Sequence, residues 1–128
     1  MSRVIHFEIH ASQPATLILF YEKLFGWTFS SWGDFPYWLV DTGSAASPGI
    51  NGGLMQRPGP AAPAGQGVNA FVCTVDVANV EDSVALALTC GGELAVPMTA
   101  IAGVGWLAYV KDPDGNLVGL MQASADAG

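Results

Sequence analysis

Three side chains near the start of the chain could do chemistry together: His6, Glu8 and His10. Because successive side chains of a strand point to opposite faces, these alternating residues share one face of a strand predicted over about 4–10. Imidazole and carboxylate groups can bind a metal ion, move a proton or hydrogen-bond a polar molecule. Three interpretations stay open: a polar wall for a bound molecule, a metal site, or simple hydrogen bonding in which Glu8 meets Arg3 or Lys111.

A metal site built from this trio would be strained. Same-face neighbours on a strand are about 7 Å apart, so one ion would have to draw three side chains together from a single strand. A second chain would need to supply another donor. Without a metal, Glu8 beside His6 could act as a general base, provided that apolar surroundings raise the pKa of its carboxyl group. Glu8 and His6 are therefore the candidate catalytic residues.

Aromatic side chains form a second set of candidates. Tyr37, Trp38 and Trp106 lie in strand-like runs, and alternation allows only one of Tyr37 and Trp38 to face a bound molecule. Strand tryptophans are more often buried in a core, and we assign Trp27 and Trp32 to the core or to a dimer contact. Four tryptophans among few charges still suit a pocket for a flat or apolar molecule.

The first half of the chain must position these residues with one helix and four strands. After the strand over about 4–10, a helix begins behind Ser12 or Gln13, has Pro14 in its first turn and ends at Gly26. Three strands follow near 27–32, 37–42 and 50–56. The apolar stripe of the helix consists of Leu17, Phe20, Tyr21, Leu24 and Phe25.

The second half repeats this order. A strand over about 69–76 precedes a helix that Asn79 caps and Gly91 ends. The inner face of this helix is expected to contain Val80, Val84, Ala87 and Leu88. Further strands are expected near 93–98, 105–111 and 116–122.

The segment 112–116, Asp-Pro-Asp-Gly-Asn, predicts the turn of a hairpin. Its proline fixes φ, its glycine can adopt positive φ, and its short polar side chains can bond to nearby backbone. No other acidic residue lies nearby in the sequence to help bind a cation. We therefore expect a structural turn with solvated carboxylates.

The two helix-ending glycines, Gly26 and Gly91, lie about half the chain apart. We therefore predict an α+β fold of two βαβββ modules, at about 1–56 and 68–128, joined by the Pro/Gly/Ala-rich linker 57–67. Together they are expected to form one domain over 1–128 with a cupped, mostly antiparallel sheet. Such a cup is concave and mostly apolar, as small-molecule sites are.

The composition argues against some partners. Hydrophobic residues make up 51% of the chain and charged residues 12%, so we expect apolar surface to be buried in a homodimer. The net charge of −7 repels the phosphates of nucleic acids and anionic lipids. Neither a nucleic acid nor a membrane is an expected partner.

The predicted compartment is the cytoplasm. The chain enters a strand-like run soon after Met1, without a long apolar segment behind a basic start, and no run of about 18 apolar residues occurs. Cys73 and Cys90 lack CxxC spacing, so both are expected to be reduced thiols in the core. Motifs of serine hydrolases, phosphate-binding loops, dinucleotide-binding loops and zinc proteases are absent.

Several segments occur in a recognisable order. They are His6 on the first strand, FYEKLFGW (20–27), GINGGLM (49–55), GVGW (103–106) and DPDGN (112–116). In this order they resemble the glyoxalase/bleomycin-resistance/extradiol-dioxygenase superfamily, also called vicinal oxygen chelate proteins, and especially bacterial glyoxalase-like proteins. The resemblance covers nearly the whole chain and implies the same two-module fold.

The resemblance also implies where a metal ion would bind. In metal-using members of that superfamily, the first and last strands of each module supply one ligand apiece. His6 matches the first ligand, whereas the second falls at Gly52 or Gly53, the third at Ala70 and the fourth at Gly119. Three of the four positions lack a side chain that can bind metal. We therefore expect no cofactor, with a divalent metal ion in a rearranged site as the alternative.

These observations predict a metal-independent, glyoxalase-like protein whose cup binds a small, largely apolar or aromatic molecule. The predicted ligand-binding residues are His6, Glu8, His10, Tyr37, Trp38 and Trp106. The alternative is an enzyme of the same superfamily, a lyase, isomerase or dioxygenase, with a rearranged metal site or a metal-free mechanism through Glu8 and His6. In a third interpretation, the cup is vestigial and the apolar surface serves protein association.

Overall fold

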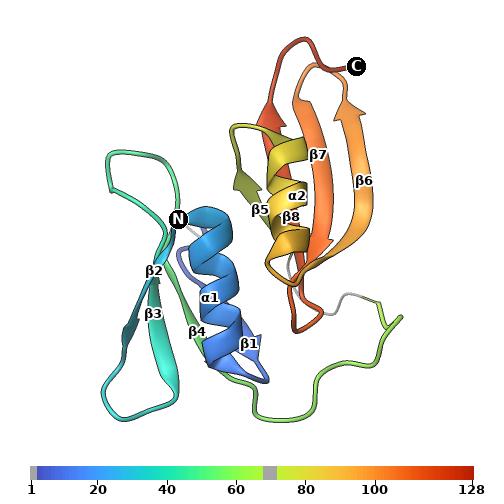
Figure 1. Cartoon of the computed structure of the whole chain (residues 1–128). Coiled ribbons are helices and arrows are strands. Elements are labelled where there is room, and N and C mark those ends of the chain that lie inside the picture. The colour runs from blue at the N-terminus through green and yellow to red at the C-terminus, as the bar shows by residue number, and fades with distance from the viewer. Residues whose placement is uncertain (1–2, 68–71) are drawn as a thin grey trace. The chain divides into compact units, whose positions relative to one another are not determined.

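A computed structural model describes residues 3–67 and 72–128, and within them one order of elements occurs twice (Figure 1). The first module contains β1 (Phe7–Ala11), α1 (Pro14–Phe25), β2 (Thr28–Ser31), β3 (Tyr37–Asp41) and β4 (Gly52–Gln56). The second module contains β5 (Cys73–Asp76), α2 (Val80–Thr89), β6 (Glu93–Ile101), β7 (Gly105–Lys111) and β8 (Leu117–Ala123). The α+β class and the two βαβββ modules are therefore confirmed. Part of the strand predicted over 69–76 lies outside the described residues.

Each module forms its own four-stranded mixed sheet, in the order β1-β4-β3-β2 or β5-β8-β7-β6. The first strand of each module pairs in parallel with the last strand, and the other neighbours are antiparallel. The chain divides into two compact units, Met1–Ala61 and Ala62–Gly128, with the boundary inside the predicted linker. That the two modules form one cup in a single domain stays a prediction.

The strand register shows that the second sheet repeats the first with an offset of 66 positions. Glu8 pairs with Gly53, and Thr74 pairs with Gly119, so both members of the pair shift by the same amount. The offset is visible in the sequence as Gly-Leu-Met-Gln at 53–56 and again at 119–122. This tetrapeptide repeat is a more direct signal of duplication than the spacing of helix-ending glycines.

The glutamine that ends each tetrapeptide anchors its helix. Gln56 Nε2 donates to the Ser12 carbonyl at 3.1 Å, just before α1. Gln122 Oε1 accepts from the Val80 N–H at 3.0 Å, in the first turn of α2. In both modules the last strand is therefore tied to the chain entering the helix, which satisfies polar groups that a helix start leaves unpaired.

Helix α1 packs its apolar stripe against one face of the first sheet. The buried side chains of the stripe are Leu17, Phe20, Tyr21 and Leu24. Gln13 is the N-cap residue, and Pro14 occupies the first helical turn as predicted. Gly26 ends the helix with φ of 73°, and its N–H donates to the Glu22 carbonyl at 2.9 Å. A left-handed residue at this position is most favourable as glycine.

Helix α2 buries a narrower stripe than the sequence predicts. Asn79 caps it as expected, accepting a hydrogen bond from the Asp82 N–H at 2.9 Å. Val80 and Ala87 are buried, whereas Leu88 is exposed, so its predicted place on the inner face is wrong. Val80 and Ala87 lie two turns apart on one line, and Leu88 is rotated by about 100° from Ala87.

Both helices are short. Helix α1 has 12 residues and α2 has 10. Across residues 3–67 and 72–128, no helix combines the length and apolar character needed to cross a membrane.

The hairpin turn predicted at 112–116 is present, but one of its carboxylates is not solvated. Asp112 is only 3% exposed, and its Oδ1 accepts hydrogen bonds at 2.9 Å from the N–H groups of Asp114 and Asn116. Its Oδ2 accepts from Asn116 Nδ2 at 3.0 Å. The expectation of a solvated carboxylate is wrong here, because the turn folds its own N–H groups around the side chain.

Replacing Asp112 with alanine is expected to lower the free energy of unfolding by about 2 kcal/mol, since buried donors lose a charged acceptor. Asp112→Asn keeps a carbonyl acceptor and should cost less. Urea denaturation of the two variants and the parent protein measures both effects. Equal stability of Asp112→Ala and the parent would show that the turn holds without its central acceptor.

The two thiols are not both in the core. Cys73 is exposed and Cys90 is half-buried, and both are free. Cys73 is the first residue of β5, an edge strand with a neighbour on one side only. The predicted core position is therefore wrong for Cys73, because an edge position leaves part of a side chain uncovered.

Candidate functional site

The first sheet has one apolar face and one face that carries both polar and apolar side chains. Cross-strand partners share a face, so Ile9 lies with Leu54 and Glu8 lies with Gly53 on the opposite side. Leu54 is fully buried on the side covered by α1, as is Val40. The other side, opposite α1, is called the open face below.

The strand register shows which of Tyr37 and Trp38 lies on the same face as Glu8 and His10. Tyr37 pairs with Met55, which also pairs with His10, so Tyr37 lies on the open face. Trp38 pairs with Leu54 and therefore lies on the side of α1. Tyr37 joins the predicted site residues His6, Glu8 and His10, and the structure does not bring Trp38 to them.

A glycine allows Tyr37 to lie flat across the open face. A Cβ atom built on Gly53 would overlap the hydroxyl and the ring of Tyr37. Gly53 does not have a positive φ, so the backbone conformation alone does not require glycine. The close approach of the phenol does require it, and this places the Tyr37 hydroxyl above Gly53, the cross-strand partner of Glu8.

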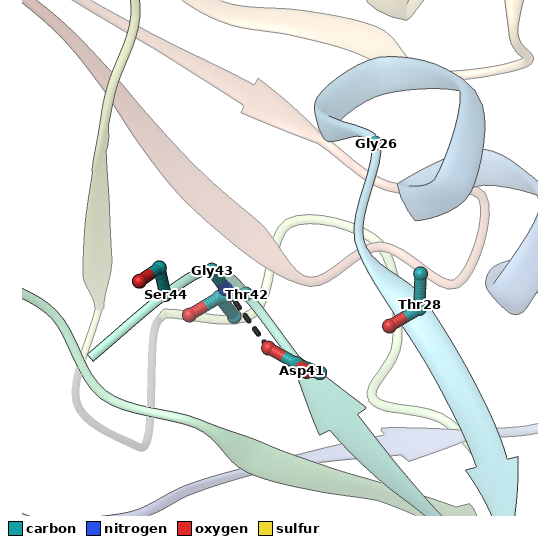
Figure 2. A pocket seen from close by; sticks show the side chains of 6 residues that line it. All are labelled: Gly26, Thr28, Asp41, Thr42, Gly43 and Ser44. Carbon is teal, nitrogen blue, oxygen red and sulfur yellow. Dashed lines mark hydrogen bonds between the residues drawn. The ribbon is translucent and has the colours of Figure 1, made fainter. Parts of the chain in front are cut away.

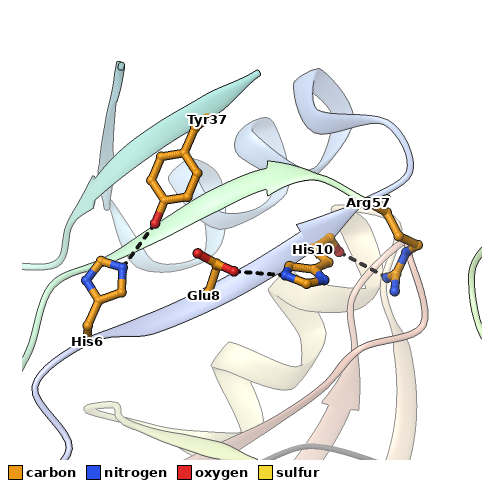
Figure 3. A network of polar contacts seen from close by, with 5 residues as sticks. All are labelled: His6, Glu8, His10, Tyr37 and Arg57. Carbon is orange, nitrogen blue, oxygen red and sulfur yellow. Dashed lines mark hydrogen bonds and ion pairs between the residues drawn. The ribbon is translucent and has the colours of Figure 1, made fainter. Parts of the chain in front are cut away.

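The open face carries a row of hydrogen-bonded polar groups, shown in Figure 3 and called the polar row below: His6, Tyr37, Glu8 and His10. His6 Nε2 lies 3.0 Å from the Tyr37 hydroxyl, and His10 Nε2 lies 2.9 Å from Glu8 Oε1. Because an ionised carboxylate only accepts, His10 donates through Nε2. At the far end, Arg57 Nη2 donates to the His10 carbonyl at 3.0 Å.

These contacts fix the charge of Glu8. The hydrogen bond from His10 is the main cause that lowers the pKa of the Glu8 carboxyl, and interaction with Tyr37 lowers it further against an opposing effect of burial. The pKa of Tyr37 is raised, first by burial and then by the neighbouring Glu8 carboxylate. Near neutral pH, Glu8 is therefore an ionised acceptor and Tyr37 a neutral phenol.

This electrostatic state contradicts the condition set for general-base catalysis. A raised pKa was required of Glu8, whereas its pKa is lowered and its side chain is 40% exposed. Its side-chain partner in the first module is His10 on the same strand, and not Arg3 as one of the open interpretations had it. Pairing of Glu8 with Lys111 of the second module stays a prediction. A catalytic role for Glu8 and His6 stays a prediction without this support.

A groove of about 580 Å³ adjoins the polar row at Tyr37. It is lined by Trp32, Phe35, Pro36, Tyr37, Leu39 and Met55, all of the first module. Trp32 is 55% exposed and Phe35 70% exposed, so the groove presents two aromatic side chains to solvent. The predicted core position of Trp32 is wrong, and its alternative in a dimer contact stays a prediction.

Local geometry explains why these aromatics are exposed. The N–H of Trp32 donates to the Tyr37 carbonyl at 2.9 Å, which closes the β2–β3 hairpin, and Gly33 has φ of 56° within the connecting turn. Trp32 and Phe35 are thus held at a hairpin tip. The run Trp-Gly-Asp-Phe-Pro-Tyr-Trp at 32–38, apolar residues around a turn signal, was the sequence signal for this groove.

A second hollow, of about 300 Å³, lies at the opposite end of β3 (Figure 2). It is lined by Gly26, Thr28, Asp41, Thr42, Gly43 and Ser44. Asp41 Oδ1 accepts from the Gly43 N–H at 3.0 Å, and the Thr42 N–H donates to Asn51 Oδ1 at 2.9 Å. These bonds stabilise the loop itself, so the hollow is explained by turn geometry.

The positions implied for metal ligands do not fit a metal ion. A side chain at Gly52 would overlap Phe7, and one at Gly53 would overlap Tyr37. A Cβ on Gly119 would lie 2.9 Å from Thr74 Oγ1 and 3.1 Å from the Tyr109 ring.

The remaining positions add no cluster of donors. Ala70 lies outside the described residues, and the offset of 66 makes Val72 the equivalent of His6. Within residues 3–67 and 72–128, no three His, Cys, Asp or Glu side chains are grouped to hold a metal ion.

Trp27 and Trp106 are described by their surroundings within their own modules. Trp27 stacks on Tyr21 at 5.3 Å and contacts Phe25 at 4.8 Å, and it is half-buried, at the edge of the core to which, or to a dimer contact, it was assigned. Trp106 lies in β7 of the second module, on the same face as the buried Ala108 and Val110. Trp106 is therefore on the buried side of its own sheet, and its predicted place in a ligand site with residues of the first module stays a prediction.

Comparison with solved structures identifies the fold. Three similar structures are a glyoxalase/bleomycin resistance protein/dioxygenase family enzyme of Burkholderia phytofirmans PsJN, a glyoxalase-related enzyme of Fulvimarina pelagi and a glyoxalase/bleomycin resistance protein of Albidiferax ferrireducens T118. Their TM-scores are 0.72, 0.72 and 0.68, at 15%, 16% and 18% sequence identity. The matches cover 93%, 100% and 96% of this chain and 97%, 96% and 100% of those chains. No protein-family model and no curated protein matches the sequence.

Proposed function

We propose that this chain, which has the glyoxalase/bleomycin-resistance fold, binds a small, largely apolar or aromatic molecule on the open face of its first sheet without a metal ion. The observation that carries the proposal is the groove of about 580 Å³, in which apolar side chains meet a hydrogen-bonded polar row at Tyr37. Pockets for small molecules combine apolar walls with a few convergent polar groups in this way.

The exposed aromatic residues supply the driving force for binding. Trp32 and Phe35 leave large apolar surfaces in water, and a flat molecule that covers them removes that surface from solvent. Leu39 and Met55 continue the groove along β3 and β4. A ligand in the groove would reach the Tyr37 hydroxyl at one end, where the polar row can orient it.

The chemistry of the metal-ligand positions supports binding without a metal. At Gly53 of β4, where a metal-binding side chain would be needed, the Tyr37 phenol occupies the space. The corresponding space beside β8 is bounded by Thr74 and Tyr109. His6 itself is engaged with Tyr37, so the polar row is arranged for hydrogen bonding to an organic molecule.

Calorimetric titration with 1-naphthylmethanol, in the presence of a chelator, tests the proposal. Trp32→Ala and Phe35→Ala are each expected to weaken binding by about tenfold, because each removes aromatic contact surface. Both side chains are exposed, so neither change should unfold the protein. Leu19→Ala is the matched control, since Leu19 is an exposed apolar residue of α1 and lies beyond the opposite face of the same sheet.

Two results would contradict the proposal. If the parent protein does not bind the probe, or if both aromatic variants bind it with unchanged affinity, the groove is not the binding site. Retention of one equivalent of Mn, Fe, Ni or Zn after dialysis, lost in His6→Ala, would instead support an enzyme with a rearranged metal site.

A further inference from the structure

We propose that the molecule bound in the groove carries a positively charged nitrogen on its apolar body, so that its chemical class is an organic ammonium ion. This inference rests on the proposed function and adds to it the sign of the ligand's charge. Two separate features of the open face lead to it: the arrangement of fixed charges and the aromatic lining of the groove.

Apart from the two histidines, the charged side chains on the described strands of the open face are both carboxylates. Glu8 lies in the polar row, and Asp41 lies on the same face at the end of β3, since it alternates with Tyr37 and Leu39. Arg57 approaches from beyond β4, and its Nη2 bonds to the main-chain carbonyl of His10, at the end of the row away from His6 (Figure 3). Glu8 does not line the groove itself, but its carboxylate lies beside Tyr37, which does.

Glu8 retains the capacity to accept another hydrogen bond. A carboxylate has about four lone-pair directions on two oxygens, and the hydrogen bond from His10 uses only one of them. An ammonium group carries only donors, so it complements this acceptor without competing for the donors of the row.

The aromatic lining favours the same charge. Trp32, Phe35 and Tyr37 line one groove, and the face of an aromatic ring attracts a cation through its quadrupole. Tyr37 connects the two features, because its ring lines the groove while its hydroxyl lies over Gly53, beside Glu8. A cationic group is therefore favoured both at the aromatic lining of the groove and beside the carboxylate.

Three probes with one ring system and different charges test this inference: 1-naphthylmethylamine, 1-naphthylmethanol and 1-naphthoate. Calorimetry at about pH 8, where the amine is still largely protonated and Glu8 is ionised, should show the amine binding about tenfold tighter than the alcohol. The carboxylate probe should bind most weakly. Glu8→Gln should reduce the ratio of the amine affinity to the alcohol affinity from about tenfold to about one.

Asp41→Asn is the matched control. It removes the same charge from the same face but lies outside the groove, and its amide oxygen can still accept from the Gly43 N–H. If the overall negative charge of the protein caused the preference, this variant would reduce it as much as Glu8→Gln does.

Each outcome has a distinct meaning. Equal affinities for the amine and the alcohol would overturn the inference while leaving the proposed function intact. Tighter binding of 1-naphthoate would also overturn it and would point to the histidines as the anchoring groups. Absence of binding by all three probes would contradict the proposed function itself.

Discussion

Replacing Leu54 with alanine lowers the free energy of unfolding by about 3–4 kcal/mol, the expected cost of deleting a fully buried leucine side chain and leaving a cavity. Leu54 is 0% exposed in the middle of β4, between β1 and β3 and on the side of α1. Such a loss is a large part of the stability of a small domain. Urea or thermal denaturation followed by circular dichroism measures it.

Leu39→Ala provides the matched control for Leu54→Ala. Leu39 lies on the neighbouring strand β3, pairs with Gly53 and faces the opposite side, where it is exposed. We expect its replacement to change stability by less than about 1 kcal/mol, because little apolar surface is lost from the core. Similar losses for the two variants would show that the assignment of the faces is wrong.

Replacing Gly53 with alanine is expected to cost about 2–3 kcal/mol, because one added methyl group forces the Tyr37 ring out of its position. The effect should come from this contact alone, since the backbone at Gly53 suits any residue. In a Tyr37→Ala background, where the obstructing ring is gone, Gly53→Ala should cost less than about 0.5 kcal/mol. Chemical denaturation of the four proteins in this double-mutant cycle measures the coupling.

Gly49→Ala is the matched control for Gly53→Ala, because it adds the same methyl group at a glycine with free space around it. Gly49 has no positive φ, and a Cβ there would meet nothing within 4 Å. Its replacement is expected to leave stability unchanged or raise it by up to about 1 kcal/mol, through a less flexible unfolded chain. If Gly53→Ala costs the same with and without the Tyr37 ring, the phenol does not lie over Gly53 in solution.

The contact between Tyr37 and Gly53 connects stability to function. In the first module, a glycine on the last strand makes room for a tyrosine that lines the groove and bonds to His6. In the second module, Gly119 has the Tyr109 ring and Thr74 beside it. At both glycines, therefore, neighbouring side chains occupy the space that a side chain would need.

Much of the fold was predictable from local pattern. The helical stripe that includes Leu17 and Phe20, the stop at Gly26 and the cap at Asn79 each depend on neighbours a few residues apart, which a sequence displays directly. The common face of Glu8 and His10 follows from strand alternation in the same way. These predictions were confirmed because backbone geometry alone relates such residues.

The rest of the site depends on which strands become neighbours and in what register. That pairing puts Tyr37 over Gly53 and beside His6, turns Trp38 toward α1, and sets the pKa of Glu8 through its contacts. The residues around Tyr37 that form the groove come from two strands and a hairpin tip. Contacts of this kind join residues far apart in the chain, and local periodicity carries no information about them until the hydrogen bonds of the sheet fix the register.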